Sequence, residues 1–189
     1  MNAIRKKPGK RFWWLIDQIK ANRFAVGAEI GCANGTTTAK LLQNCPTLKL
    51  YAVDKWERIA KAPGVGGREE DENYVGMYNW DPVKGFEQFT SRVRGYRRRL
   101  FILRGDSVEM ADKVANNSLD FIFIDADHSY QGVIRDLAAW VPKLKPGGLL
   151  SGHDIHLAGV HRAVVEKIPN YQEAGTDYVW FAKKEDYVD

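Results

Sequence analysis

The sequence of 189 residues predicts an α/β fold in which helices cover both faces of a mostly parallel sheet. The first observation is that short apolar runs with strand character alternate with segments whose apolar residues recur at helical spacing. The second is the composition, 44% hydrophobic and 12% aromatic, which suffices for a sizeable core. No internal repeat or low-complexity tract interrupts the pattern. We therefore expect one domain over residues 1–189.

An aromatic segment, "RFWWLIDQI", opens the domain as a helix over about residues 10–23. Five strand-like runs follow, rich in Val, Ile, Leu, Phe and Tyr. They occupy residues 25–31, 49–54, 100–106, 119–125 and 147–152. Between the fourth and fifth runs, Val133, Leu137 and Trp140 form a helical stripe that "KPGG" ends.

The end of the chain adds two more strands. A short helix is expected over about residues 158–168. Residues 171–175 and 178–184 are β-like, and the tight Thr176-Asp177 turn that joins them predicts a hairpin. The complete sheet would then have seven strands.

Residues 57–80 form a long irregular stretch rich in glycine and charge. Loops of this length are often lids over a binding site, so we expect an insertion or lid here. Aromatic residues in this stretch and nearby either line an acceptor pocket or pack a cap onto the core. They are Trp13, Trp14, Trp56, Tyr74, Tyr78 and Trp80.

Charge and cysteine content bear on the partners and the cellular location of the protein. The 28 basic and 24 acidic residues give a net charge of only +4, a weak argument for nucleic acid. Cys32 and Cys45 form neither a zinc-ligand pair nor a disulfide framework. The chain has no apolar signal-peptide core and no membrane-spanning apolar run, so we expect a cytoplasmic protein without membrane contact.

Two basic clusters keep a second type of partner open. They are "IRKKPGKR" at residues 4–11 and "SRVRGYRRRL" at residues 91–100. The second continues a helix that Asp81 would cap, with Pro82 in its first turn. We interpret it as a solvated helix end, with binding of RNA or an acidic ligand as the alternative.

Polar residues follow the first two strands, where ligands bind in open α/β sheets. Glu29, Gly31 and Gly35 form an E-x-G-x-x-x-G turn before a helix that Thr36 would cap. Asp54 follows Gly35 by 19 positions, the place of an acid that accepts ribose hydroxyls. The turn lacks the middle glycine of a dinucleotide fingerprint. A different nucleoside-bearing cofactor is therefore favoured.

The runs "AEIGCANG", "YAVDKWE" and "LRGDS" resemble the motifs of class I S-adenosylmethionine-dependent methyltransferases over nearly the whole chain. The resemblance implies a Rossmann-like sandwich and S-adenosylmethionine as cofactor. It implies that Gly31 and Gly35 approach the methionine moiety and that Glu29 lies near its ammonium. The remaining implied cofactor contacts are Asp54 at the ribose, Trp56 in the same motif, and Asp106 with Ser107 at the adenine.

The fourth and fifth strands end in "IDADHSY" and "GGLLSGHDIH", a pairing similar to metal-assisted O-methyltransferases that act on small molecules and sugars. This likeness implies that Asp125, His153 and Asp154 hold Mg²⁺ or another divalent cation. His128 stands where the family has a lysine base. The likeness therefore implies that His128 and Asp125 are the catalytic residues. Because histidine is a softer ligand than carboxylate, the site could also hold Mn²⁺ or Fe²⁺.

The expected function is methylation of a hydroxyl on a small molecule or sugar, with or without metal assistance. An RNA or protein methyltransferase that uses the basic clusters is the alternative, although "DADH" differs from the (N/D)-P-P-(Y/F) motif of base-amino enzymes. A binding protein without catalysis is a third reading. The DADH-like pattern also resembles cephalosporin hydroxylases, so the fold alone does not decide the reaction. The acceptor and the oligomeric state stay open.

Overall fold

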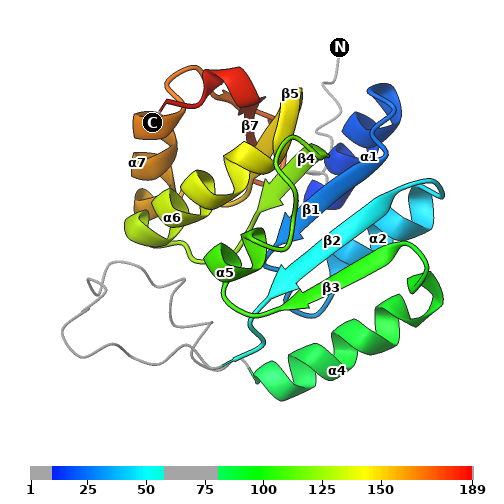
Figure 1. Cartoon of the computed structure of the whole chain (residues 1–189). Coiled ribbons are helices and arrows are strands. Elements are labelled where there is room, and N and C mark those ends of the chain that lie inside the picture. The colour runs from blue at the N-terminus through cyan, green and yellow to red at the C-terminus, as the bar shows by residue number, and fades with distance from the viewer. Residues whose placement is uncertain (1–9, 58–80, 189) are drawn as a thin grey trace, which may run out of the picture.

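A computed structural model describes residues 10–57 and 81–188, and its centre is one sheet (Figure 1). In the described residues the sheet has seven strands in the order β3-β2-β1-β4-β5-β7-β6. The strands are β1 (Val26–Ile30), β2 (Lys49–Asp54), β3 (Leu100–Arg104), β4 (Leu119–Ile124), β5 (Leu144–Gly152), β6 (Gln172–Glu173) and β7 (Trp180–Lys183). The predicted mostly parallel sheet and its C-terminal antiparallel hairpin are confirmed.

The register of the sheet brings four strand ends to one edge. Ile30 of β1 is level with Val53 of β2 and with Ile124 of β4. Ile124 is in turn level with Gly152 of β5. Because these strands are parallel, the residues that follow each of them meet at the same carboxyl edge. β7 then pairs antiparallel with both β5 and β6.

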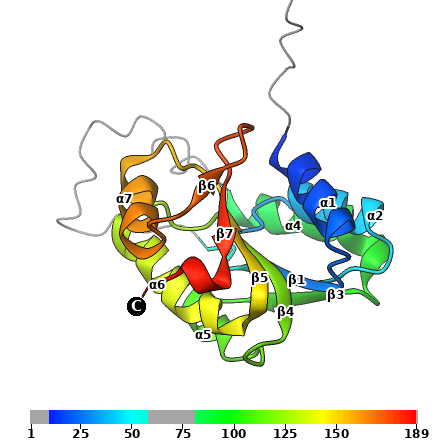
Figure 2. The ribbon, with the colours of Figure 1, turned by 90° about the horizontal axis from the view of Figure 1, so that it is seen from above.

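Helices cover both faces of the sheet, as predicted (Figure 2). One face carries α1 (Arg11–Ala21), α2 (Thr36–Asn44) and α4 (Pro82–Val93). The other carries α5 (Ser107–Ala111), α6 (Tyr130–Trp140) and α7 (Ala158–Lys167). Three 3₁₀ turns complete the described elements: η1 (Arg94–Tyr96), η2 (Val141–Lys143) and η3 (Lys184–Asp186). The described helices are too short or too polar to span a bilayer.

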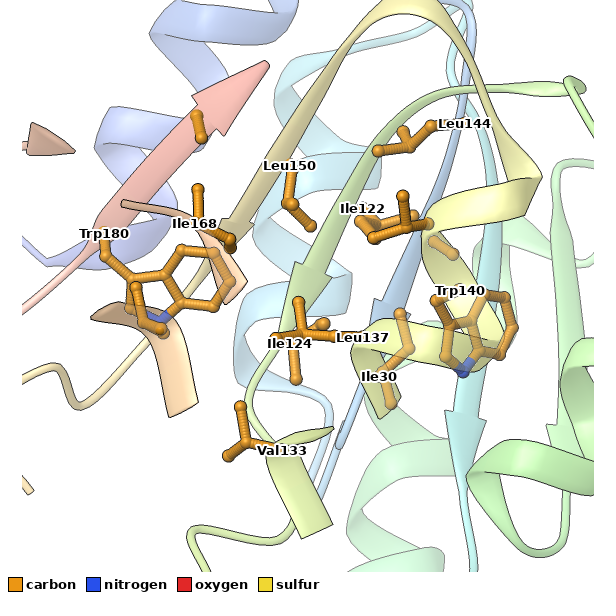
Figure 3. Close-up of a cluster of buried hydrophobic side chains, with 14 of the residues drawn as sticks. Ile30, Ile122, Ile124, Val133, Leu137, Trp140, Leu144, Leu150, Ile168 and Trp180 are labelled. Atoms are coloured by element: carbon orange, nitrogen blue, oxygen red, sulfur yellow. The ribbon is translucent and has the colours of Figure 1, made fainter. Parts of the chain in front are cut away.

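Two apolar cores hold the layers together. On the α6 face, Ile30, Ile124 and Leu137 pack between Trp140 and Trp180, and all five are buried (Figure 3). On the α2 face, a second core joins α1, α2 and α4 to the sheet. A fully buried side chain of this size contributes about 1.5–3 kcal/mol. The carboxyl edge is therefore fixed from both sides.

Local capping agrees with the sequence at one helix and differs at another. Asp81 accepts hydrogen bonds from the Val83 and Lys84 amides and begins α4, with Pro82 in the first turn, as predicted. The predicted cap at Thr36 is wrong, because α2 begins after Gly35 in a left-handed conformation. The Thr36 hydroxyl instead donates to Asn34 Oδ1.

The N-terminal helix, the five central strands and the final hairpin all lie within a few residues of their predicted positions. The expected lid falls outside the described residues, except for Glu57. The same is true of the pocket residues Tyr74, Tyr78 and Trp80, and of most of the first basic cluster.

Candidate active site

The turn after β1 is held by two glycines. Gly31 has φ +89° and Gly35 has φ +76°, values that only glycine adopts without strain. A Cβ on Gly31 would lie 2.0 Å from the Asp125 carbonyl oxygen, and one on Gly35 would meet the Phe89 ring. Both glycines therefore let the turn pack closely against β4 and α4, and the turn lies at the carboxyl edge.

Asp54, at the end of β2, ties this turn in place. Its Oδ2 accepts hydrogen bonds from the Cys32 and Ala33 amides at 2.9 and 2.8 Å, and its Oδ1 accepts from the Trp56 amide at 2.8 Å. A carboxylate offers about four acceptor sites, so capacity for a ligand hydroxyl is left. Trp56 lies in the second core, which joins α1, α2 and α4 to the sheet, and is 2% exposed. Its indole N–H donates to the Ala33 carbonyl at 2.7 Å.

Asp106 and Ser107 begin α5 after β3. Asp106 Oδ1 accepts from the Val108 amide, and Lys55 Nζ lies 2.5 Å from Oδ2. The hydrogen bond from Lys55 holds the pKa of Asp106 below its usual value. The Ser107 hydroxyl donates to Asp136 and accepts from Trp140 Nε1, so it belongs to a network with α6. Asp106 lies outside this network, and its side chain is 27% exposed.

Glu29 lies inside the sheet and points toward α2. It is 2% exposed, and the Thr38 hydroxyl donates to its Oε2 at 2.5 Å. Burial, helped by the nearby Asp125, raises the pKa of Glu29 to about 8, against the opposing effects of the Thr38 hydrogen bond and the Arg11 charge. The carboxyl is therefore mostly protonated at neutral pH without a cationic partner.

The ends of β4 and β5 form an acid–imidazole cluster. Asp125, His128 and Asp154 each offer one ligand atom, and these atoms lie within 4.8 Å of one another. His128 Nε2 is 3.2 Å from Asp154 Oδ2 and 3.7 Å from Asp125 Oδ1. The ring of His153 is equally close, with Nδ1 3.3 Å from Asp125 Oδ1 and 3.0 Å from Asp154 Oδ1. The structure thus brings together all four residues predicted from these two strand ends.

The charges in this cluster are strongly coupled. Burial disfavours the charged form of Asp125, yet His128, His153 and Arg11 hold its pKa well below the usual range. Burial likewise opposes protonation of His153, but Asp125 and Asp154 raise its pKa to about 9. The pKa of His128 is raised against the effect of burial by the same two carboxylates. The two imidazoles and the Arg11 guanidinium thus favour the ionised form of Asp125.

The donor set fits a divalent cation. Nε2 of His128 and both ring nitrogens of His153 are buried and form no aligned hydrogen bond among the described residues. A cavity of about 10 Å³, lined by Asp125, His128 and His153 among others, lies beside them. This volume suits one water molecule or ion rather than an organic ligand. Two carboxylates with imidazole suit Mn²⁺ or Fe²⁺ as well as Mg²⁺.

Two residues at this edge were not predicted from the sequence. Arg11 Nη2 lies 3.0 Å from Asp125 Oδ2, and the Arg11 amide donates to Asp177 Oδ2 at 2.7 Å. Asp177 Oδ2 is also 3.9 Å from His153 Nε2. In the sequence, Arg11 belongs to a basic cluster and Asp177 to a predicted turn, and neither pattern indicates an active-site residue. Only the packing of α1 against the hairpin brings them there.

Backbone strain marks the same edge. Asp154, Asp177 and Tyr178 have φ of +57°, +47° and +53°, a conformation that side-chain-bearing residues rarely adopt. Tyr178 is 57% exposed and its ring centroid lies 3.9 Å from that of His156. Such strain persists where the surrounding structure enforces it, often at functional sites.

Comparisons with known proteins agree with this geometry. Residues 28–155 match the family described as "Methyltransferase domain". A similar curated protein is the uncharacterized protein y4gI of Sinorhizobium fredii (strain NBRC 101917 / NGR234), 22% identical over 142 residues. The match covers 75% of this chain but only 14% of that relative.

Solved structures share the fold at low identity. The O-methyltransferase NovP is 15% identical with a TM-score of 0.69, and the match covers 91% of this chain and 77% of NovP. The TDP-rhamnose 3′-O-methyltransferase CalS11 is 14% identical with a TM-score of 0.59, covering 90% and 77%. The family match spans the glycine turn, Asp54 at the end of β2 and the acid–imidazole cluster, so the chain belongs to the family of S-adenosylmethionine-dependent methyltransferase domains.

Proposed function

We propose that this chain transfers the methyl group of S-adenosylmethionine to a hydroxyl of a small molecule or sugar, assisted by a divalent cation. The cluster of Asp125, His128 and Asp154 at the carboxyl edge carries the proposal. It lies directly beside the glycine turn, since Gly31 packs against the Asp125 backbone. The solved relatives named above include two O-methyltransferases, one of them acting on TDP-rhamnose, which supports the same acceptor class.

For the methyl donor, we assign the adenosyl part to the ends of β2 and β3. Asp54 has acceptor capacity for a ribose hydroxyl beyond its three backbone bonds. Asp106 stands at the start of α5, where it would border the adenine. Glu29 and the glycine turn would face the methionine end. The buried Trp56 and the Ser107 network would support these contacts from behind rather than touch the cofactor.

For the acceptor, we assign Asp125, Asp154 and His153 to the cation and His128 to the proton. A bound divalent cation would lower the pKa of the acceptor hydroxyl and orient it. His128 is the more exposed of the two imidazoles, 20% against 10%, so it is better placed to take a proton from a ligand. Because the ligand atoms of Asp125, His128 and Asp154 also lie within 4.8 Å of one another, the alternative assignment makes His128 the third cation ligand and His153 the base.

The second basic cluster does not favour an RNA or protein substrate. Arg92 reaches the Asn34 carbonyl of the glycine turn, but Arg97, Arg98 and Arg99 directly precede β3, whose length of roughly 17 Å separates them from the strand ends at the proposed site. The Arg99 guanidinium donates to the carbonyls of Leu42, Cys45 and Leu48, which is a structural role. We therefore expect a small-molecule acceptor.

The decisive experiment measures binding of S-adenosylhomocysteine and methyl transfer by the same preparations. Wild type, Asp125→Asn and Asp154→Asn are compared by calorimetry, and turnover is followed as S-adenosylhomocysteine release with catechols, flavonoids and sugar nucleotides as acceptors. We expect all three proteins to bind S-adenosylhomocysteine similarly, while the variants and EDTA-treated wild type lose turnover at least about 100-fold. Full turnover in EDTA would exclude the cation's role. Failure of wild type to bind S-adenosylhomocysteine would exclude the methyltransferase activity.

A further inference from the structure

Arg11 is the first residue of α1, and its position is fixed by contacts of this helix with the β6–β7 turn and with β7. Its amide donates to Asp177 Oδ2 at 2.7 Å in the β6–β7 turn. One helical turn on, the Trp14 and Phe181 rings lie 5.2 Å apart, so α1 also packs on β7. These contacts bring the start of α1 to the carboxyl edge of the sheet. The backbone that carries the guanidinium is therefore anchored at the site.

The guanidinium uses only part of its donor capacity. Nη2 lies 3.0 Å from Asp125 Oδ2, while Nε is buried and has no hydrogen-bond partner within residues 10–57 and 81–188. A buried donor without a partner costs free energy, and guanidinium offers five N–H groups in a planar fork. The side chain remains 33% exposed, so a ligand can reach it. This arrangement suits an additional anion with two oxygen atoms.

Two other cations on the described part of this edge already have partners. Lys55 is paired with Asp106, and Arg92 donates to the Asn34 carbonyl and to Gln88. Asp125 has its Oδ1 beside His128 and His153 and only its Oδ2 beside Arg11. Glu29 is close enough that the Arg11 charge opposes the rise of its pKa. Arg11 is thus a cation that contacts Asp125 of the acid–imidazole cluster and also acts electrostatically on Glu29.

The methionine end of S-adenosylmethionine is a zwitterion, with an ammonium and a carboxylate on one carbon. An acid near the ammonium leaves the carboxylate in need of a cation or of free N–H groups. We propose that Arg11 binds the carboxylate of the methyl donor through its unused guanidinium donors while Glu29 faces the ammonium. The inference rests on the proposed function, because it deepens how the same cofactor is recognised.

The test uses two nucleoside probes that differ in the amino-acid part. S-adenosylhomocysteine carries the carboxylate and the ammonium, whereas 5′-methylthioadenosine carries neither. Each is titrated by calorimetry, in EDTA, into wild type, Arg11→Gln, Arg11→Lys and Lys20→Gln. Lys20 lies in the last turn of the same helix, so Lys20→Gln is a control with an equal change of charge. Thermal unfolding of each protein checks that it is folded.

We expect Arg11→Gln to weaken S-adenosylhomocysteine about 10- to 100-fold, the usual effect of losing a charge-assisted hydrogen bond. Binding of 5′-methylthioadenosine should change less than about twofold. Arg11→Lys should give an intermediate loss, because it keeps the charge without the fork. Lys20→Gln should bind both probes like wild type.

Two results would overturn the inference while leaving the proposed function intact. Unchanged S-adenosylhomocysteine binding in Arg11→Gln would show that Arg11 serves Asp125 alone. Equal weakening of both probes would show that Arg11 acts through the placement of α1. If Arg11→Gln does not fold, Arg11→Lys carries the same comparison, since a selective loss for S-adenosylhomocysteine supports the inference and an equal loss rejects it. By contrast, wild type that binds neither probe would refute the proposed function itself.

Discussion

Glu29 is an acid that the fold keeps protonated, and this links stability to pH. Its pKa is about 8 in the folded chain against an ordinary value of 4.5, so the folded state holds the proton more tightly than the unfolded state. Stability from this group is therefore lost as pH rises from about 4.5 to about 8. The sign is opposite to that of a salt-bridged carboxylate.

Glu29→Gln should remove this dependence. The glutamine oxygen can still accept from Thr38, and it has no proton to lose. We expect the variant to match wild type near pH 5 and to gain stability relative to it up to about pH 8, measured as the free energy of unfolding in urea. Burial also raises the pKa of Asp136, to about 6, but both proteins keep this residue, so its contribution cancels in the difference between them. A constant difference between the two proteins from pH 5 to 8 would contradict the prediction.

The roles of the two histidines separate in a metal titration. We expect His153→Asn to weaken Mn²⁺ binding at least about tenfold, because it removes a proposed ligand. His128→Asn should keep most of the Mn²⁺ affinity and slow methyl transfer most at low pH, where less of the acceptor is ionised. Electron paramagnetic resonance of free Mn²⁺ measures the affinity. The reverse pattern would make His128 the ligand and His153 the base.

At the scale of single residues, the sequence predicted which side chains reach the carboxyl edge better than what they contact. Glu29, Asp54 and Asp125 follow directly from strand ends. The Ser107 hydroxyl, by contrast, donates a hydrogen bond to Asp136, 29 positions away, and no local motif indicates this contact. The pairing of the Arg11 amide with Asp177 spans 166 positions. Contacts of this separation depend on how α1 and the hairpin pack, and periodicity carries no information about that.

The β1–α2 turn is an element whose shape depends on glycine. Gly31→Ala would combine a positive φ with a Cβ 2.0 Å from a backbone oxygen that cannot move away freely. Gly147→Ala is the matched control, since φ is +72° but no atom lies within 4 Å of the added Cβ.

We expect Gly147→Ala to cost about 1–2 kcal/mol, the left-handed penalty alone, and Gly31→Ala to cost clearly more. Urea unfolding of both variants measures the difference. Equal losses would mean that the turn relaxes away from β4. A larger loss for Gly31→Ala, with weaker S-adenosylhomocysteine binding, would tie the shape of the turn to the cofactor.

Element boundaries were predictable where chemistry is local. The apolar runs gave the five central strands, and Asp81-Pro82 gave the start of α4. The start of α2 was misassigned because a left-handed Gly35, and not a hydroxyl, ends the turn. At α6, Ser129 caps through its hydroxyl while Asp127 accepts from the Ser129 amide. Several polar residues stand side by side in "DADHS", so composition alone does not decide which one caps.

For the whole molecule, ligands that bind only the folded state should raise its thermal stability. At 100 times its dissociation constant, each ligand contributes about 2.7 kcal/mol, or roughly 5–10 °C for a domain of this size. We expect S-adenosylhomocysteine and Mn²⁺ each to raise the unfolding temperature of wild type in a calorimetric scan. Asp125→Asn should keep the first shift and lose the second. Loss of both shifts would place Asp125 in cofactor binding as well.

One carboxylate touches both halves of this edge. Asp125 presents Oδ1 to the imidazoles and Oδ2 to Arg11, so its two oxygens face different subsites. A cation that draws Oδ1 must alter how firmly Oδ2 holds the guanidinium. Thermodynamic reciprocity then requires that the factor by which Mn²⁺ changes the affinity for S-adenosylhomocysteine equals the factor by which S-adenosylhomocysteine changes the affinity for Mn²⁺. Donor and metal loading would thus be heterotropically coupled through a single side chain.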